Sequence, residues 1–387
     1  MKYSATTVES YHSTGQGGIK PLKVAVVGTG FGQKIHIPGF QESPNTEMVV
    51  VYNRDIEKAS AIADKYQIPN ACDRVSDVAK MPEVEAVSIS TPPFLHYDMA
   101  KTVLEAGKHL LLEKPTTLSA TEARSLYHIA KANGAIVSMD FEFRFMPEWQ
   151  RFKELLDDGY CGKKRLIKID WLASSRANPD RPWNWYAQKE KGGGALGAIG
   201  SHTFDYIAWL FGSVKRLSAN FSTSIPERRD PADGDKLKPV DADDICFLML
   251  ELHDGTPVQI CLSSTTYQGR GHFVEVYGDR GTLVLGSSNQ KDYGHGFTIQ
   301  GAPAGESFNH LEIPDRLQFS QTYTNGLLAP FIRVVDHWVQ GINSGQSVVP
   351  SLKEGVYSQL LMDLTHESNA TGTWVTVPDF EKFLASG

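Results

Sequence analysis

Cysteine is scarce in this chain, and metal-binding patterns are missing. The 387 residues include four cysteines that stand far apart, and the chain has neither a Cys-x-x-Cys pair nor two histidines at metal-ligand spacing. These absences exclude the common zinc motifs and a disulfide framework. We therefore expect no metal site and four reduced, mostly structural thiols, at Cys72, Cys161, Cys246 and Cys261.

Long apolar runs and a surplus of positive charge are also missing. No apolar stretch approaches the roughly 18 residues of a membrane span, and residues 1–20 lack the continuous apolar core of a signal peptide. The formal net charge of −7 offers no basic surface for a polyanion. We expect a cytoplasmic protein that binds neither nucleic acid nor membrane, with residues 1–20 as a flexible leader.

Short apolar runs alternate with helical patterns from residue 21 to residue 144, which is typical of a parallel sheet covered on both faces. Gly107 and Gly134 stand where helix C-caps are required, and either Ser119 or Thr121 is placed to cap the last helix of this part. This half is predicted to be a Rossmann-type, doubly wound α/β domain that binds a dinucleotide. Its expected strands are Lys23–Val27, Met48–Tyr52, Ala86–Ser90, His109–Leu112 and Ala135–Met139, and its expected helices are Ile56–Tyr66, Leu95–Ala106 and Ala120–Ala132.

Residues 145–387 differ in character: one helix is followed by stretches rich in β-branched and aromatic residues with hairpin-like connections. They predict an α+β domain with a large, mainly antiparallel open sheet. The expected strands are Leu166–Leu172, Leu217–Ser224, Ile245–Leu252, Val258–Thr265, Phe273–Tyr277 and Thr282–Leu285. The expected helices are Trp149–Leu156, Leu327–Ile342 and Leu352–Glu367; residues 228–239 are expected to form a surface loop, and Gly341 and Gly372 to mark turns.

A glycine-rich loop follows the first predicted strand. Gly28 suits the tight turn and Gly30 the close approach of a pyrophosphate to the backbone, but the third glycine of G-x-G-x-x-G would fall at Gln33, while Gly32 stands one residue earlier. Taken alone, the pattern is equally consistent with a plain glycine turn. The candidate cofactor-binding residues of this loop are Gly28, Thr29, Gly30, Phe31, Gly32 and Gln33.

Asn53-Arg54-Asp55 follows the second predicted strand, where NAD-specific proteins place a carboxylate for the ribose. An amide followed by a guanidinium favours the 2′-phosphate of NADP(H), with Asn53 and Arg54 as cofactor contacts. NAD(H) remains possible because a small shift in register brings Asp55 into reach. The alternative is that Arg54 and Asp55 are surface charges that open a helix.

Two further segments fall at the carboxyl edge of the predicted sheet, where doubly wound folds bind ligands. Thr91, Pro92 and His96 follow the third strand, and Glu113-Lys114-Pro115 follows the fourth. A lysine there is partly desolvated and suited to donate or accept a proton, or to hold a substrate oxygen. The alternatives are a proline-stiffened turn at Pro92 and a salt bridge between Lys114 and Glu113.

In the second half, Gly192-Gly193-Gly194 leads into a predicted helix that carries His202 and Asp205 three residues apart on one face. A histidine can transfer protons near neutral pH. A single helical histidine is more often structural, but the glycine run before it indicates that the backbone there is in close contact with a neighbouring group.

Taken in order, these motifs resemble the glucose–fructose oxidoreductase, inositol dehydrogenase and rhizopine-catabolism (Gfo/Idh/MocA) family. The resemblance is carried by Gly28-Thr-Gly30-Phe-Gly32, Ser90-Thr91-Pro92-Pro93 with His96, Glu113-Lys114-Pro115, Phe143-Arg144-Phe145 with Pro147, and Gly192-Gly193-Gly194 leading to Gly200-Ser201-His202 and Asp205. It implies hydride transfer between NAD(P) and a sugar, a polyol or a related compound. It also implies that Lys114 contacts cofactor and substrate hydroxyl, that His202 is the active-site histidine, and that the second sheet carries a subunit contact.

Two departures from the family pattern concern the mechanism. The aspartate that commonly stands four residues before the histidine is Ala198 here, which leaves His202 and Lys114 as the predicted acid/base pair. The frequent asparagine before the Arg-Phe pair is Glu142, a carboxylate with a possible polar or proton-handling role. We expect Glu142, Arg144 and Asp205 to contact the substrate.

These observations predict an NAD(P)-dependent oxidoreductase that acts on a carbohydrate-like hydroxyl or carbonyl group. Two other functions known among relatives stay open: a non-enzymatic regulator that senses the dinucleotide, which the missing aspartate favours, and a glycosidase that retains its cofactor. A mainly antiparallel second sheet also makes face-to-face assembly plausible, so we expect a homodimer or homotetramer.

Overall fold

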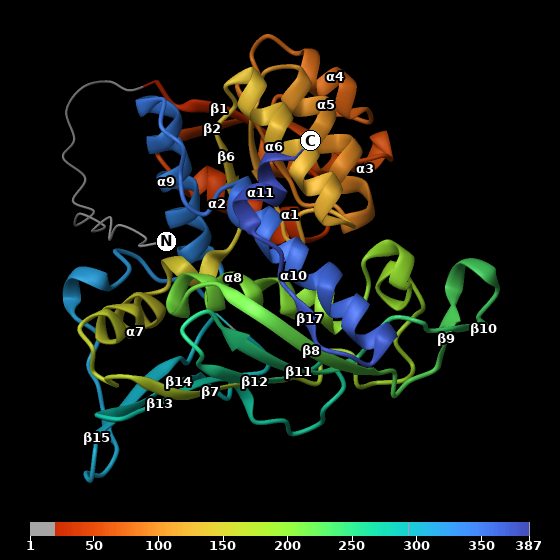
Figure 1. Ribbon diagram of the computed structural model, residues 1–387. Coiled ribbons are helices and arrows are strands. Elements are labelled where there is room, and N and C mark those ends of the chain that lie inside the picture. Colours follow the sequence, from red (N-terminus) through yellow and green to blue (C-terminus); the bar gives the residue numbers. More distant parts are fainter. Residues whose placement is uncertain (1–19, 293, 387) are drawn as a thin grey trace.

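The structure is a computed structural model that describes residues 20–292 and 294–386, so the predicted leader lies outside the described residues except for Lys20. The chain forms two sheets, with helices between and around them (Figure 1). The first sheet has the order β3-β2-β1-β4-β5-β6, and every pair in it is parallel. Its strands are β1 (Leu22–Val27), β2 (Thr46–Tyr52), β3 (Asn70–Cys72), β4 (Ala86–Ile89), β5 (His109–Leu112) and β6 (Val137–Met139).

Both faces of the first sheet are buried, because alternate residues of β1 belong to different clusters of the core. Val24 and Val26 pack with residues of α2 and α9, whereas Ala25 and Val27 pack with residues of α4, α5 and α6. The helices of this part are α1 (Phe31–Lys34), α2 (His36–Glu42), α3 (Ile56–Tyr66), α4 (Val75–Lys80), η1 (Pro93–Leu95), α5 (His96–Glu105) and α6 (Ala120–Asn133).

The alternating α/β prediction is confirmed, including the cap of α6. Its N-cap is Ser119, whose hydroxyl accepts a hydrogen bond from the Glu122 N–H at 3.3 Å, and its C-cap is Gly134 with φ of +65°. The prediction missed β3 and α4, which are three and six residues long and too short for a periodic pattern. It also missed α1 and α2, which follow the glycine loop.

The second sheet has nine strands in the order β16-β15-β14-β13-β7-β12-β11-β8-β17. All pairs are antiparallel except β12 with β7, which confirms the mainly antiparallel prediction. The strands are β7 (Lys164–Leu172), β8 (Val214–Ser222), β11 (Ile245–Leu252), β12 (Pro257–Ser263), β13 (Gly271–Gly278), β14 (Gly281–Ser287), β15 (Thr298–Pro303), β16 (Asn309–His310) and β17 (Val375–Thr376).

Helices lie on the face of the second sheet that is turned toward the first (Figure 1). The last long helices connect the halves, because α9 packs on α2 and α10 packs on both α6 and β8. The helical elements are η2 (Glu142–Phe145), α7 (Pro147–Asp157), η3 (Trp185–Ala187), η4 (Lys189–Lys191), η5 (Leu196–Gly200), α8 (Ser201–Phe211), η6 (Pro231–Asp233), η7 (Asp315–Leu317), α9 (Leu328–Ser344), α10 (Leu352–Thr371) and α11 (Phe380–Ala385).

Two local predictions are wrong. The expected loop over residues 228–239 is a hairpin of β9 (Glu227–Asp230) and β10 (Lys236–Pro239), held by buried Arg228, whose guanidinium donates to backbone carbonyls of residues 176–181. Gly341 lies inside α9, where its missing side chain leaves room for Val348; the helix ends at Gly345, with φ of +65°. The expected turn at Gly372 is confirmed as the C-cap of α10.

The four cysteines are free thiols, as expected, and three of them are buried. Among the described residues, no helix combines the length and the apolarity that crossing a membrane requires.

Candidate active site

The glycine loop connects β1 to α1 and packs tightly against the end of β4. Gly28 has φ of +105°, and a Cβ at this residue would lie 2.9 Å from the backbone of Ser90 and Thr91. A Cβ on Gly32 would collide with the Ser90 hydroxyl and approach Val26 to 3.2 Å. Gly32 thus provides the close helix-to-strand packing that the motif assigns to its third glycine, one residue before the expected position.

Gly30 occupies the open side of the same loop. It is exposed, a Cβ there would meet no atom within 4 Å, and it is the N-cap of α1 without a side-chain hydrogen bond. A glycine loop that ends at an uncapped helix start suits a dinucleotide pyrophosphate. Thr29, Phe31 and Gln33 flank it with half-buried or exposed side chains, so the residues present fit a nicotinamide dinucleotide.

The residues after β2 bear on the choice between NAD(H) and NADP(H). The half-buried Asn53 amide donates to the Thr29 hydroxyl, and its carbonyl accepts from the Asp55 N–H at 2.9 Å. Asp55 is the N-cap of α3, where it accepts from the Lys58 N–H at 3.3 Å. Because the helix uses that carboxylate and the Asn53 amide is bound to Thr29 and to the Asp55 N–H, the exposed guanidinium of Arg54 remains available at this edge.

Thr91 and Pro92 follow β4 and are half-buried at the carboxyl edge of the sheet. His96 lies behind them and is fully buried. Its Nε2 is 2.7 Å from the Thr91 carbonyl oxygen and its Nδ1 is 2.9 Å from the Pro115 carbonyl oxygen, and burial lowers its pKa. His96 therefore ties the loop after β4 to the loop after β5, and its influence on a cofactor acts through these loops.

Lys114 follows β5 and is half-buried, and the Lys114–Pro115 peptide bond is cis. Its Nζ donates to the carbonyl oxygen of Ala198 at 3.1 Å. The Glu113 carboxylate lies instead 3.0 Å from Nε2 of His36 and accepts from the Lys114 backbone N–H at 3.2 Å. The lysine thus bridges the first domain and the helical turn η5 of the second.

Glu142 and His202 meet beside this bridge. Glu142 Oε1 lies 3.7 Å from His202 Nε2, and the two residues are 5% and 2% exposed. Burial raises the pKa of Glu142 to about 8, although the charge of Lys114 opposes the shift. Burial, together with the charges of Lys114 and His272, lowers the pKa of His202. At neutral pH the pair is therefore an imidazole beside a largely protonated carboxyl group.

Arg144 and Asp205 form a bidentate ion pair, with Nε to Oδ2 at 2.9 Å and Nη2 to Oδ1 at 2.6 Å. Both side chains are buried. The pair fixes η2 against α8, and so fixes Glu142 relative to His202. Their positions in the sequence do not indicate this contact, because 61 residues separate the partners.

A buried cluster under the cofactor loops was not apparent in the sequence. His36 places Nδ1 2.7 Å from the Ser88 hydroxyl, while its Nε2 lies 3.0 Å from Glu113 and 3.8 Å from Asp140. Burial and the Glu113 charge raise the pKa of Asp140. Burial acts in the same direction on Glu113, but hydrogen bonds with His36 and Asp140 and the charges of His36 and Lys114 together lower its pKa. The sequence did contain one signal for this cluster, because Asp140 comes directly after β6 and the strand ends of a parallel sheet meet at one edge.

Aromatic side chains of η2 and of the second sheet enclose His202; Phe143 belongs to a motif that the sequence showed, whereas Trp171 was not singled out. The ring of Trp171 stacks on His272 with centroids 4.0 Å apart, and Phe143 meets His202 edge-on at 5.0 Å. Burial lowers the pKa of His272 to about 3. These rings keep water from the imidazole and explain the lowered pKa of His202.

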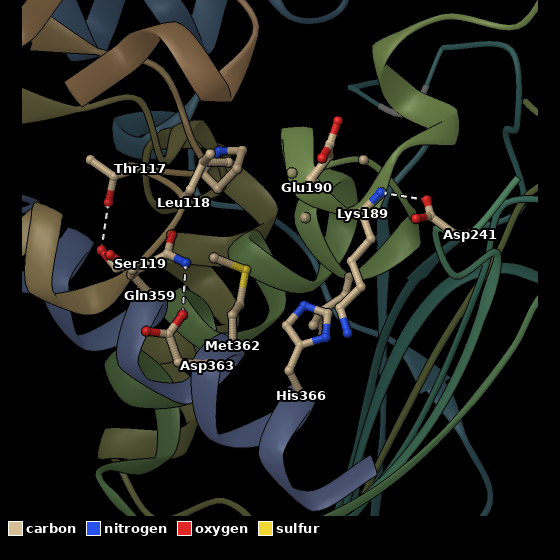
Figure 2. A pocket seen from close by; sticks show the side chains of 15 residues that line it. Thr117, Leu118, Ser119, Lys189, Glu190, Asp241, Gln359, Met362, Asp363 and His366 are labelled. Atoms are coloured by element: carbon tan, nitrogen blue, oxygen red, sulfur yellow. Dashed lines mark hydrogen bonds between the residues drawn. The ribbon is translucent and has the colours of Figure 1, made fainter. Parts of the chain in front are cut away.

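A cavity of about 560 Å³ lies between α10 and the loops after β5 and before α8 (Figure 2). Pro115 and Gly197, the neighbours of Lys114 and Ala198, form part of its wall. Gln359 and His366 project into it from α10; within the described residues, Oε1 of the glutamine and Nδ1 of the histidine are buried without a hydrogen-bond partner. Polar side chains from both halves of the chain, among them Ser119, Lys189 and Asp363, line this cavity.

Comparison with known protein families gives two matches that together span most of the chain. Residues 22–141 match the description "Oxidoreductase family, NAD-binding Rossmann fold". Residues 153–377 match "Oxidoreductase family, C-terminal alpha/beta domain". Both descriptions belong to the Gfo/Idh/MocA group.

Individual relatives agree with these matches. An uncharacterized oxidoreductase of Synechocystis sp. is 52% identical over 364 residues, which are 94% of this chain and 98% of the relative. Levoglucosan dehydrogenase of Pseudarthrobacter phenanthrenivorans is 26% identical over 397 residues, covering 92% of this chain and 98% of that enzyme. A solved structure of levoglucosan dehydrogenase with NADH and L-sorbose has a TM-score of 0.82 and 25% identity, covering 93% of this chain and 99% of that one.

Proposed function

The chain belongs to the Gfo/Idh/MocA family of NAD-binding oxidoreductases, and we propose that it is a dehydrogenase acting on a hydroxyl group of a sugar, a polyol or a related compound. Relatives named for levoglucosan and for D-glucosides support this substrate class. One observation carries the proposal. Lys114, Glu142 and His202 come together beside the carboxyl edge of the first sheet, the edge that also bears the glycine loop.

The nicotinamide ring, when bound, accepts or returns the hydride of the substrate carbon. The protein has to bind the cofactor, orient the hydroxyl group and move one proton. We assign cofactor binding to the loop around Gly30 and to the segments after β2, β4 and β5. Lys114 can donate hydrogen bonds to a substrate oxygen, which supports its role as the residue that holds and polarises the hydroxyl.

The cofactor is proposed to be NADP(H), with NAD(H) as the alternative. Asp55 is engaged as a helix cap, and the exposed Arg54 is free to pair with a 2′-phosphate. A carboxylate in the place of Asn53 would repel that phosphate, and the amide does not.

Replacement of Lys114 by alanine tests the function directly. We expect K114A to keep dinucleotide binding, measured by calorimetric titration, but to lose turnover of levoglucosan or D-glucosides by about 100-fold or more. K101A, which removes a half-buried lysine of α5, is the matched control. Equal turnover by K114A and the control would contradict the role of Lys114. Tight dinucleotide binding without turnover of any sugar by the wild type would favour the regulatory function instead.

We further propose that the protein forms homodimers or homotetramers through the face of the second sheet that the described helices leave uncovered. On β11, Cys246, Leu248 and Leu250 point into the core, whereas Phe247 and Met249 point outward and are 54% and 56% exposed. Two large apolar side chains side by side on an open sheet face favour association with a second copy. The free thiols suit a reducing compartment, and we place the protein in the cytoplasm.

A further inference from the structure

In the described site, one carboxyl group lies beside the ring of His202. It belongs to Glu142 of η2 and not to a residue of α8. Four residues before His202, Ala198 brings only a methyl group, and its backbone carbonyl is taken by Lys114. Glu142 of η2 lies on another side, 3.7 Å from His202 Nε2. Within the described residues, neither ring nitrogen of His202 has a hydrogen-bond partner, so the imidazole has capacity left for Glu142, for substrate or for water.

We propose that Glu142 is a catalytic acid/base residue, which takes the proton of the substrate hydroxyl during oxidation and returns it during reduction. This inference rests on the proposed dehydrogenase function. In oxidation, the electron pair of the substrate C–H bond leaves as hydride and reduces the nicotinamide. The O–H bond breaks, a C=O bond forms, and the released proton forms an O–H bond on the Glu142 carboxylate.

The other two candidates are less suited to hold this proton. The ammonium group of Lys114 has three donors and no acceptor, so while charged it can hold a substrate oxygen but cannot accept from it. The ring of His202 is enclosed by Phe143 and Trp171, and burial lowers its pKa. A proton on that ring is costly, whereas an imidazole that stays neutral can orient the hydroxyl or pass a proton on.

The surroundings of Glu142 bring its proton affinity close to neutral pH, where an acid/base residue works in both directions. Lys114 and Glu113 act on it from the end of β5, and Asp205 acts from α8. Their charges partly cancel, and burial determines the result, a pKa of about 8. Asp140, two residues earlier in the chain, is a further buried carboxyl group nearby, and burial also raises its pKa.

The helices packed on η2 carry further charged groups. Arg333 of α9 donates to the Phe145 carbonyl at 3.1 Å, and the ring of His337 lies against that of Phe145. On α7, Glu148 is influenced by the charge of Arg333, and burial raises its pKa. Burial raises the pKa of Glu148 as it does that of Glu142, but among the described residues no hydrogen bond or ion pair joins Glu148 to His202, which makes it a matched control.

The position of Glu142 is built into the fold rather than left to a flexible side chain. Glu142 and Arg144 share one helical turn, and His202 and Asp205 share another. The bidentate Arg144–Asp205 pair joins the two turns, so Glu142 and His202 stay adjacent whenever that pair is formed.

Infrared titration in ²H₂O tests whether Glu142 holds the proton, without requiring turnover. We expect the wild type to show a protonated carboxyl band at pH 6 that disappears with a midpoint near pH 8. The band should be absent from E142Q and retained in E148Q. If the wild type and E142Q show the same titrating carboxyl bands between pH 6 and pH 10, the proposal is overturned.

Kinetics test whether this proton is used. We expect kcat/KM for sugar oxidation to rise with pH up to about pH 8, and we expect E142Q to lose that dependence and about 100-fold or more in kcat. E142D should recover part of the rate, and E148Q should behave as the wild type does. If E142Q keeps both the rate and the pH profile, Glu142 is not the acid/base residue. If the wild type itself turns over no sugar, the proposed function fails, and the infrared result alone decides whether Glu142 holds a proton.

Discussion

At the scale of single residues, the site is notable for buried charges that are balanced by specific partners. Arg144 is paired with Asp205, and Glu113 with His36, while Glu142 stays largely protonated at neutral pH because the charge of Lys114 does not outweigh its burial. Each of these groups depends on its neighbour, so replacing one residue changes the stability or the protonation of another.

Arg54 allows a test of cofactor choice. We expect R54A to weaken NADPH binding by about tenfold, or about 1.4 kcal/mol, because a charge-assisted contact to the 2′-phosphate is lost, and to leave NADH binding unchanged. Calorimetric titration with both cofactors measures this difference. K65A, which removes an exposed lysine at the other end of α3, is the control. Tighter binding of NADH than of NADPH by the wild type would contradict the proposed preference.

The raised pKa of Glu142 also predicts how the stability of the protein depends on pH. Its pKa is about 8 in the folded protein and near 4.3 in an unfolded chain, so between these values the folded state binds more protons. Stability should therefore fall as pH rises from about 4.5 to 8, by at most about 1.4 kcal/mol per pH unit from this group. Urea unfolding at pH 5 and pH 9 should show E142Q gaining stability relative to the wild type at pH 9. An identical difference at both pH values would show that Glu142 is ionised in the folded protein.

We expect the loss of the Arg144–Asp205 ion pair to have a larger effect on the free energy of unfolding. D205N removes the carboxylate from a buried guanidinium and should cost about 3–5 kcal/mol in the free energy of unfolding. K153Q is the comparison, because the Lys153–Asp157 pair of α7 lies at the surface and should contribute less than about 1 kcal/mol. Urea unfolding measures both variants, and equal losses would mean that the buried pair is better solvated than its exposure indicates.

At the scale of elements, local sequence rules worked where the element depends on its own residues. β1 is a short, mostly apolar and buried run, and β11 alternates between core and surface, so each is recognised from its own residues. The rules failed for β3 and for the hairpin of β9 and β10. The first is too short to show a period, and the second is fixed by the distant carbonyl groups that Arg228 binds.

The N-cap of α6 gives a prediction at this scale. Ser119 caps the helix, whereas Thr121, the other residue that the sequence allowed, lies in its first turn and is exposed. We expect S119A to lower the free energy of unfolding by about 1 kcal/mol, because one N–H group loses its acceptor, and T121A to change it by less than about 0.5 kcal/mol. Urea unfolding distinguishes the two, and equal effects would show that the cap does not stabilise this helix.

At the scale of the whole molecule, the second sheet has one face toward the site and another that bears exposed apolar residues. If a second copy covers this face, placing charges there should prevent assembly. We expect the wild type to elute as a dimer or tetramer in size-exclusion chromatography with light scattering, and F247E/M249K to elute as a monomer with unchanged circular dichroism. A monomeric wild type would contradict the proposed assembly.

The sequence by itself determined the parts of this protein that depend on residues close together in the chain. The glycine loop, the alternating elements of the first half, the Glu113-Lys114-Pro115 motif and the family follow from such local patterns. Even Gly32, displaced from its expected position, kept its role because only a residue without a side chain fits against Ser90.

Only the tertiary structure decided which polar groups meet. Arg144 and Asp205 are 61 residues apart in the chain, and His36 and Glu113 are 77 apart. No helical or strand period connects such distant positions. Their contacts arise because parallel strands end at one edge and because the second domain packs against that edge. The same packing removes water from Glu142 and His202, and the loss of water, rather than residue type, sets their protonation.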